Sequence, residues 1–192
     1  MTEKDILQTP EITVLGIGNA VLQDEGFGVR AVEALDKTYD FPDNVQLLDG
    51  GTLGMELLRF VTGTKKLLVI DSINGGEAPG TIFCFRNSEV LAHFQDKLSV
   101  HEVGIQDVLA LLEVTGKPIP EVTVLGAQPF AVEAGVSLTE EMAGLLPEIT
   151  QRALGQLADW GVSYQKKAVP KELAFHTLAE DHSSYEGEPQ EA

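Results

Sequence analysis

The sequence predicts an α/β fold: a three-layer α/β/α sandwich with a mostly parallel five-stranded twisted sheet and one antiparallel edge strand. Two observations predict it. Short apolar runs that suit strands buried on both faces alternate with stretches of helical hydrophobic spacing, which is typical of parallel strands joined by right-handed crossovers. One later apolar run follows its predecessor through a loop too short for a crossover helix, so we expect that strand to be antiparallel.

The first half of the chain supplies three of the expected strands. The opening apolar run breaks at Gly16, Gly18 and Asn19, residue types that tolerate left-handed backbone and the close approach of other groups. An acidic pair then precedes apolar residues at helical spacing, which predicts a helix start. In chain order the expected elements are a strand at 12–17, a helix to about 39, a strand at 45–48, a helix at 52–61 and a strand at 67–70.

The second half begins with a loop rich in glycine and proline that leads directly into the expected edge strand. Two capping boxes, Ser99 with Glu102 and Ser137 with Glu140, each predict the start of a helix. In chain order the expected elements are an edge strand at 81–85, a helix from 99 to 116, a strand at 122–125 and a helix from 137 to about 160.

The chain of 192 residues is long enough for one domain with a sizeable core and too short to argue for two. We expect a single α/β domain at 11–165. Residues 1–10 are polar and are expected to form a loose N-terminal extension. Residues 166–192 form an acidic and polar tail whose composition predicts disorder.

The composition excludes several classes of function. A net charge of −17 repels phosphate backbones, so a nucleic-acid partner is not expected. No run of about 18 apolar residues indicates a membrane span, and the charged N-terminus lacks the order of a secretory signal. The single Cys84 cannot form an internal disulfide, and we interpret it as a small buried hydrophobe. Together these features favour the cytoplasm.

Three candidate metal ligands fall at equivalent places in the predicted fold. Glu25 starts the helix after the first strand, Asp71 ends the third strand, and His101 lies in the first turn of the helix after the edge strand. If the first and third strands are neighbours, both acids face the crevice at the carboxyl ends of the strands, where open α/β sheets bind ligands. Two carboxylates and an imidazole suit a transition metal such as nickel or zinc, which would relieve the repulsion between the acids.

Other interpretations of these residues stay open. Asp71 could cap a loop, and a lone histidine is more often a satisfied residue than a ligand. A nucleotide- or small-ligand-binding protein is the rival function, because Asp49 ends the second strand like the ribose-binding acid of dinucleotide folds. Val21 occupies the position of the third glycine, however, so the dinucleotide fingerprint is incomplete. Serine-hydrolase, P-loop and Cys–His motifs are absent.

Several separated motifs together resemble one known family, the hydrogenase maturation proteases. The motifs are GIGNAVLQDEGFGVRAVEAL, LLDGGTLGMELL, LLVIDSI, APGT and SVHEVGIQDVLALLEVTG, and they match in order and spacing over about residues 11–165. The resemblance implies that Glu25, Asp71 and His101 are both metal-binding and catalytic. It also implies that Asp49, with the adjacent Gly50 and Gly51, helps to position the substrate.

The resemblance further implies a reaction and its partner. An endopeptidase of aspartyl type, expected to act as a monomer, would remove the C-terminal extension of the nickel–iron hydrogenase large-subunit precursor by one cut after a basic residue. Nickel supplied by the precursor would be the recognition signal, although zinc or cadmium could occupy the site in vitro. The metal would polarise the scissile carbonyl or activate water, with a carboxylate as general base. The sequence offers no nucleophile for an acyl-enzyme.

Overall fold

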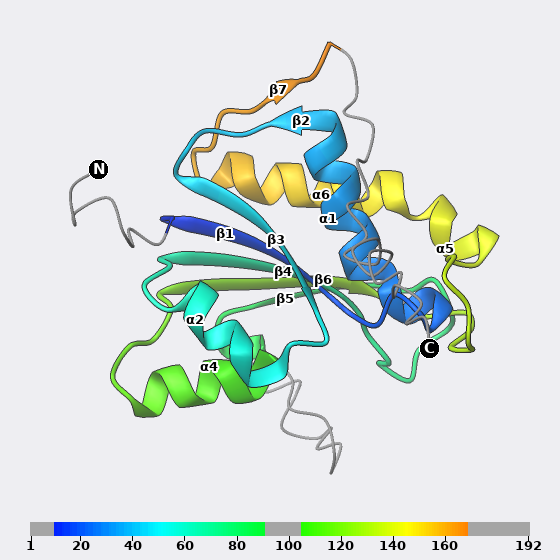
Figure 1. Cartoon of the computed structure of the whole chain (residues 1–192), viewed down its shortest axis with the longest axis horizontal. Coiled ribbons are helices and arrows are strands. Elements are labelled where there is room, and N and C mark those ends of the chain that lie inside the picture. The colour runs from blue at the N-terminus through cyan, green and yellow to red at the C-terminus, as the bar shows by residue number, and fades with distance from the viewer. Residues whose placement is uncertain (1–9, 91–104, 169–192) are drawn as a thin grey trace, which may run out of the picture.

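The computed structural model describes residues 10–90 and 105–168 (Figure 1). Five strands form one sheet in the order β3-β1-β4-β6-β5. They span Val45–Gly51 (β3), Ile12–Ile17 (β1), Lys66–Ser72 (β4), Glu121–Ala127 (β6) and Ile82–Arg86 (β5). The first four are parallel to one another and β5 pairs antiparallel with β6, as predicted.

Helices cover both faces of the sheet, which gives the three predicted layers (Figure 1). Helices α1 and α6 lie on one face, and α2 and α4 lie on the other. The helical elements span Gln23–Gly26 (η1, a 3-10 turn), Phe27–Thr38 (α1), Gly54–Leu57 (η2, a 3-10 turn), Leu58–Val61 (α2), Ile105–Val114 (α4), Glu140–Gly144 (α5) and Leu146–Asp159 (α6).

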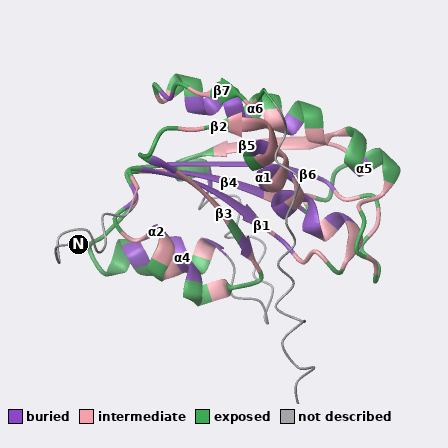
Figure 2. Cartoon of the chain, turned by 45° about the horizontal axis from the view of Figure 1, so that its top comes forward, coloured by how far each residue is buried: buried purple, intermediate pink, exposed green. Residues whose placement is uncertain are grey.

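Both faces of the sheet are apolar because successive residues of the buried strands are apolar and their side chains point to opposite sides. Val14 and Leu68 pack with Leu35 of α1 in one core cluster. Their chain neighbours Leu15 and Leu67 belong to the cluster on the other face. Figure 2 shows the buried residues concentrated in these central strands. The continuous apolar runs of the sequence are therefore strands buried on both faces.

Two predicted helices differ from those observed. The second helix is shorter than 52–61: Gly54 adopts a positive φ of 54°, and a 3-10 turn precedes the four residues of α2. The capping box at Ser137 is wrong, because Thr139 is the N-cap and its Oγ1 accepts from Met142 N at 3.2 Å. The last predicted helix is divided into α5 and α6, with Pro147 in the first turn of α6, where a missing N–H is tolerated.

A short two-stranded ribbon was not predicted. Tyr39–Asp40 (β2) pairs antiparallel with Gln165–Lys166 (β7), and Lys167 N donates to Thr38 O at 2.9 Å. Strands of two residues carry no detectable alternation, so sequence periodicity could not find them.

Some expectations fall outside the described residues. They are the start of the extension at 1–9, the capping box of Ser99 with Glu102, His101, and the tail from 169 onward. A helix with the length and apolarity needed to cross a membrane does not occur in the part of the chain that the structure describes.

Candidate active site

The carboxyl ends of β3, β1 and β4 meet at one edge of the sheet. Gly16 on β1 is the register partner of Asp49 on β3 and of Ile70 on β4. Asp71 follows Ile70 directly, so the two aspartates end strands on either side of β1. The predicted adjacency of the first and third strands is confirmed, and it brings Asp71 to the turn that follows β1.

Glycines allow the acidic helix start to rest directly on the strand ends. A Cβ at Gly28 would lie 2.0 Å from the Ile70 carbonyl oxygen and 2.4 Å from that of Ile17. A Cβ at Gly18, whose φ is +134°, would lie 1.8 Å from the Glu25 carbonyl oxygen. Side chains at either glycine would push the turn that carries Glu25 away from β1 and β4, because these contacts are to backbone atoms that cannot rotate aside.

Asp71 lies in a desolvated environment beside a second acid. Burial raises the pKa of the Asp71 carboxyl from 3.8 to about 8, although the hydrogen bond from Ser72 N, 2.7 Å from Asp71 Oδ1, acts to lower it. The negative charge of Glu25 contributes a further increase in the pKa. The two acids therefore influence each other electrostatically, as expected for a carboxylate pair that a cation would neutralise.

The raised pKa of Asp71 predicts how the stability of the metal-free chain depends on pH. The folded state binds a proton that the unfolded chain releases near pH 4, so the stability contributed by this proton is lost as pH rises from about 4 to about 8. Asp71→Asn, which keeps an acceptor for Ser72, is expected to raise the free energy of unfolding at pH 8 by roughly 2–5 kcal/mol and to change it little at pH 4. Urea unfolding with a chelator present measures both values. An equal effect at the two pH values would contradict this assignment.

Asp49 lies one strand away from Asp71, across β1, and its side chain is exposed. Its Oδ1 accepts from Gly51 N at 2.9 Å, which holds the carboxylate at the end of β3. Gly51, with a φ of +44°, accepts at its oxygen from Gly18 N at 3.1 Å. A Cβ at the buried Gly50 would lie 2.7 Å from Leu15 Cδ1, so the Leu15 side chain would have to shift. This segment is thus tied to the glycine turn of β1 and faces solvent beside it.

The third predicted ligand, His101, lies outside the described residues. Within residues 10–90 and 105–168, no group of three or more His, Cys, Asp or Glu side chains could hold a metal ion. The described part of the site therefore consists of the Glu25–Asp71 pair. Two carboxylates are oxygen donors that carry negative charge, so they fit a divalent cation and leave coordination positions for ligands from elsewhere.

Asp24 supports the turn that carries Glu25, a role that the sequence did not single out. Its side chain is fully buried, and its two oxygens accept four hydrogen bonds from the segment that follows β6. Asp24 Oδ2 accepts from Phe130 N and Ala131 N, both at 3.0 Å, and from Thr139 Oγ1 at 3.0 Å, whereas Oδ1 accepts from Thr139 N at 2.7 Å. Adjacent acids in a helical first turn look alike in sequence, so no pattern could show that Asp24 anchors the turn on which Glu25 lies.

The buried side-chain amide of Gln128 holds the loop that follows β4. Gln128 Oε1, just after β6, accepts from Gly75 N at 2.8 Å, and its Nε2 donates to Asn74 Oδ1 at 3.1 Å. The loop after β4 is therefore fixed next to Asp71. The predicted glycine-rich loop before the edge strand is confirmed, and it begins beside Asp71.

Comparisons with known proteins agree with the resemblance seen in the sequence. A family model described as hydrogenase maturation protease matches residues 29–156. The hydrogenase expression/formation protein HupD of Rhizobium leguminosarum bv. viciae is 40% identical over 179 residues, which cover 92% of this chain and 88% of the relative. The hydrogenase 2 maturation protease of Escherichia coli K12 is 40% identical over 166 residues, which cover 86% of this chain and 98% of the relative.

A solved structure agrees as well. The hydrogenase maturating endopeptidase HybD from E. coli has a TM-score of 0.77 to this chain at 39% identity, with 82% of this chain and 98% of that chain covered. The sequence match covers almost the whole of the chain, and the solved structure has a similar fold. This chain belongs to the hydrogenase maturation protease family.

Proposed function

We propose that this chain is the endopeptidase that removes the C-terminal extension from the precursor of a nickel–iron hydrogenase large subunit, and that nickel already inserted in the precursor is its recognition signal. Family membership makes the chain a peptidase. The observation that supports the metal-dependent step is the Glu25–Asp71 pair, in which a half-buried carboxyl with a pKa of about 8 lies within the field of a second acid.

We expect the carboxylate pair to bind the nickel of the precursor and to activate the water that attacks the scissile bond. Burial, and to a smaller extent the charge of Glu25, raises the pKa of Asp71, and a cation held by the two acids would favour the ionised form, so binding would be coupled to loss of its proton. His101 is the proposed third ligand. A carboxylate that the metal leaves free would accept a proton from the attacking water as general base. The cut is proposed to follow a basic residue, which the net charge of −17 would attract.

Nickel dependence is tested with two forms of the same precursor. The purified chain is incubated with a nickel-loaded and a nickel-free large-subunit precursor, and the release of the extension is followed by mass spectrometry. We expect cleavage of the loaded precursor and none of the nickel-free one. Equal cleavage of both forms would refute nickel as the signal, while cleavage of neither would refute the proposed substrate. Zinc and cadmium serve as further metals in binding titrations of the enzyme alone.

Asp49 is proposed to position the substrate rather than to bind metal. It is exposed and lies on the far side of β1 from Asp71. Asp49→Asn is expected to raise the KM for the nickel-loaded precursor about tenfold or to shift the cut, while nickel affinity stays near that of the wild type. Steady-state kinetics, product masses and calorimetric titration measure these quantities. A loss of nickel affinity as large as that of Asp71→Asn would instead make Asp49 a ligand.

The rival nucleotide-binding function lacks support at the helix start. Dinucleotide folds place a pyrophosphate at this helix N-terminus, where backbone N–H groups attract anions. Here the turn before α1 carries Asp24 and Glu25, and their charges oppose a phosphate. Adding NAD or ATP is expected to leave the melting temperature unchanged, whereas a clear rise would revive the rival.

A further inference from the structure

Large apolar side chains are exposed beside the turn that carries Glu25. Eight such side chains occur among the described residues, and four of them belong to the turn before η1 and to the segment after β6. We call these four the apolar rim: Val21, Phe130, Val132 and Val136, whose exposed fractions are 59%, 39%, 50% and 67%. Exposed apolar groups gathered at one site more often mark a binding surface than apolar residues scattered singly.

Backbone hydrogen bonds hold the two parts of the apolar rim together. Gly135 N donates to Val21 O at 3.0 Å, and Gln23 N donates to Gly135 O at 2.9 Å. Leu22 and Gly135 form an isolated parallel bridge. Val136 follows Gly135, which pairs with the turn of Val21. Glu25 lies four residues after Val21 in the sequence.

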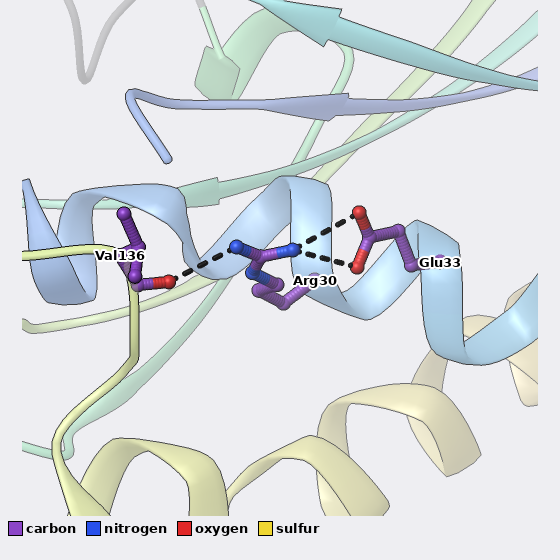
Figure 3. A network of polar contacts seen from close by, with 3 residues as sticks. All are labelled: Arg30, Glu33 and Val136. Carbon is purple, nitrogen blue, oxygen red and sulfur yellow. Dashed lines mark hydrogen bonds and ion pairs between the residues drawn. The ribbon is translucent and has the colours of Figure 1, made fainter. Parts of the chain in front are cut away.

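The segment of the apolar rim is also anchored by buried and charged side chains. The Asp24 carboxylate accepts from Phe130 N and Ala131 N at its beginning. At its far end Arg30 Nη2 donates to Val136 O at 3.0 Å, and Arg30 is itself held by Glu33 at 3.0 Å (Figure 3). The backbone of the segment is thus fixed at both ends while its apolar side chains remain in water.

This arrangement has a physical consequence for binding. Apolar surface left in water is unfavourable by about 25 cal/mol for each Å², and that free energy is recovered when a partner covers it. Because the backbone is already ordered, covering the apolar rim requires little further loss of conformational entropy. A fixed apolar surface on the turn that leads to Glu25 therefore suits a polypeptide that binds at Glu25.

We infer that the apolar rim is the surface on which the precursor polypeptide packs when its scissile bond reaches Glu25. The ligand is an uncharged, apolar stretch of the precursor near the cut. The occupant follows from continuity: the hydrogen-bonded turn of Val21 leads into η1, so a chain bound at Glu25 passes beside it. The inference rests on the proposed function and adds an apolar subsite to the Glu25–Asp71 pair.

The test compares a rim variant with a matched control elsewhere on the surface. Val132→Ser/Val136→Ser removes apolar area without adding charge, and Val114→Ser does so at the end of α4, where Val114 is 84% exposed. For the nickel-loaded precursor we expect KM to rise about tenfold or more in the rim variant, with kcat within about twofold of the wild type. The control is expected to match the wild type. The rise in KM is expected at both low and high salt, because apolar contacts are not screened.

Several results would overturn the inference. One is an unchanged KM in the rim variant. Another is a wild-type dimer that the rim variant separates while KM stays the same, which would make a second copy the occupant. A third is a lower unfolding midpoint in the rim variant with no change in KM, which would mean that the chain covers its own rim. If the wild type fails to cut the precursor, the proposed function falls, and calorimetric binding of the uncut precursor to the same variants still decides the inference.

Discussion

Glu25→Gln and Asp71→Asn are each expected to lower the rate of precursor cleavage by at least about a hundredfold, with a folded chain in both cases. Each amide keeps the size of the side chain but removes the charge that would hold the precursor's nickel or accept a proton. The residues lie at the surface end of the sheet, so the core is not disturbed. For Asp71→Asn the free energy of unfolding without metal is expected to increase at neutral pH, because folding no longer requires this carboxyl, whose pKa is raised to about 8, to take up a proton.

A matched acid at the other end of the sheet provides the control. Asp43 is exposed and lies just before the amino end of β3, so Asp43→Asn is expected to cleave at the wild-type rate. His101→Ala is expected to lose cleavage like the two amide variants. Calorimetric nickel titration beside the cleavage assay separates metal binding from chemistry. Wild-type metal binding and processing by any one of the three variants would remove that residue from the site.

Much of this fold could be predicted from the sequence because its strands are buried on both faces. Runs such as 67–70 favour a strand buried on both faces, and the glycine and proline loop at 75–80 leaves no room for a crossover helix. The strand order then places the ends of β1 and β4 together. Glu25 and Asp71 could be paired from sequence for that reason: parallel strands end at the same edge.

The features that sequence reasoning missed depend on long-range contacts. Thr139 caps α5, although Ser137 with Glu140 matches the capping-box pattern, because the backbone N–H and the hydroxyl of Thr139 both reach the buried Asp24 carboxylate. Local propensity is overridden when a tertiary partner determines which residue ends a loop. The exposed position of Asp49 likewise follows from where its strand ends in the sheet.

Asp24→Ala is expected to lower the free energy of unfolding by about 3 kcal/mol or more. The variant leaves Phe130 N, Ala131 N and Thr139 N without their acceptor, the fully buried Asp24 carboxylate. Asp24→Asn is expected to be nearly as destabilising, because one carboxylate oxygen becomes an NH₂ group that faces donors. The released segment also carries the apolar rim, so KM for the precursor is expected to rise in parallel. Urea unfolding and steady-state kinetics measure the two effects.

Arg30→Gln tests the partly exposed contacts at the far end of the apolar rim, for comparison with the contacts of the buried Asp24 at its beginning. It removes the hydrogen bond to Val136 O and the ion pair with Glu33, both partly exposed, and is expected to lower the free energy of unfolding by about 1 kcal/mol or less. The difference between the two variants follows from burial: the Arg30 contacts are partly exposed, so water can replace them, whereas the Asp24 carboxylate that accepts from the three amide groups is fully buried. Equal destabilisation by Asp24→Ala and Arg30→Gln would mean that the Asp24 carboxylate is hydrated in solution. The turn that carries Glu25 would then be positioned mainly by its glycine contacts with β1 and β4.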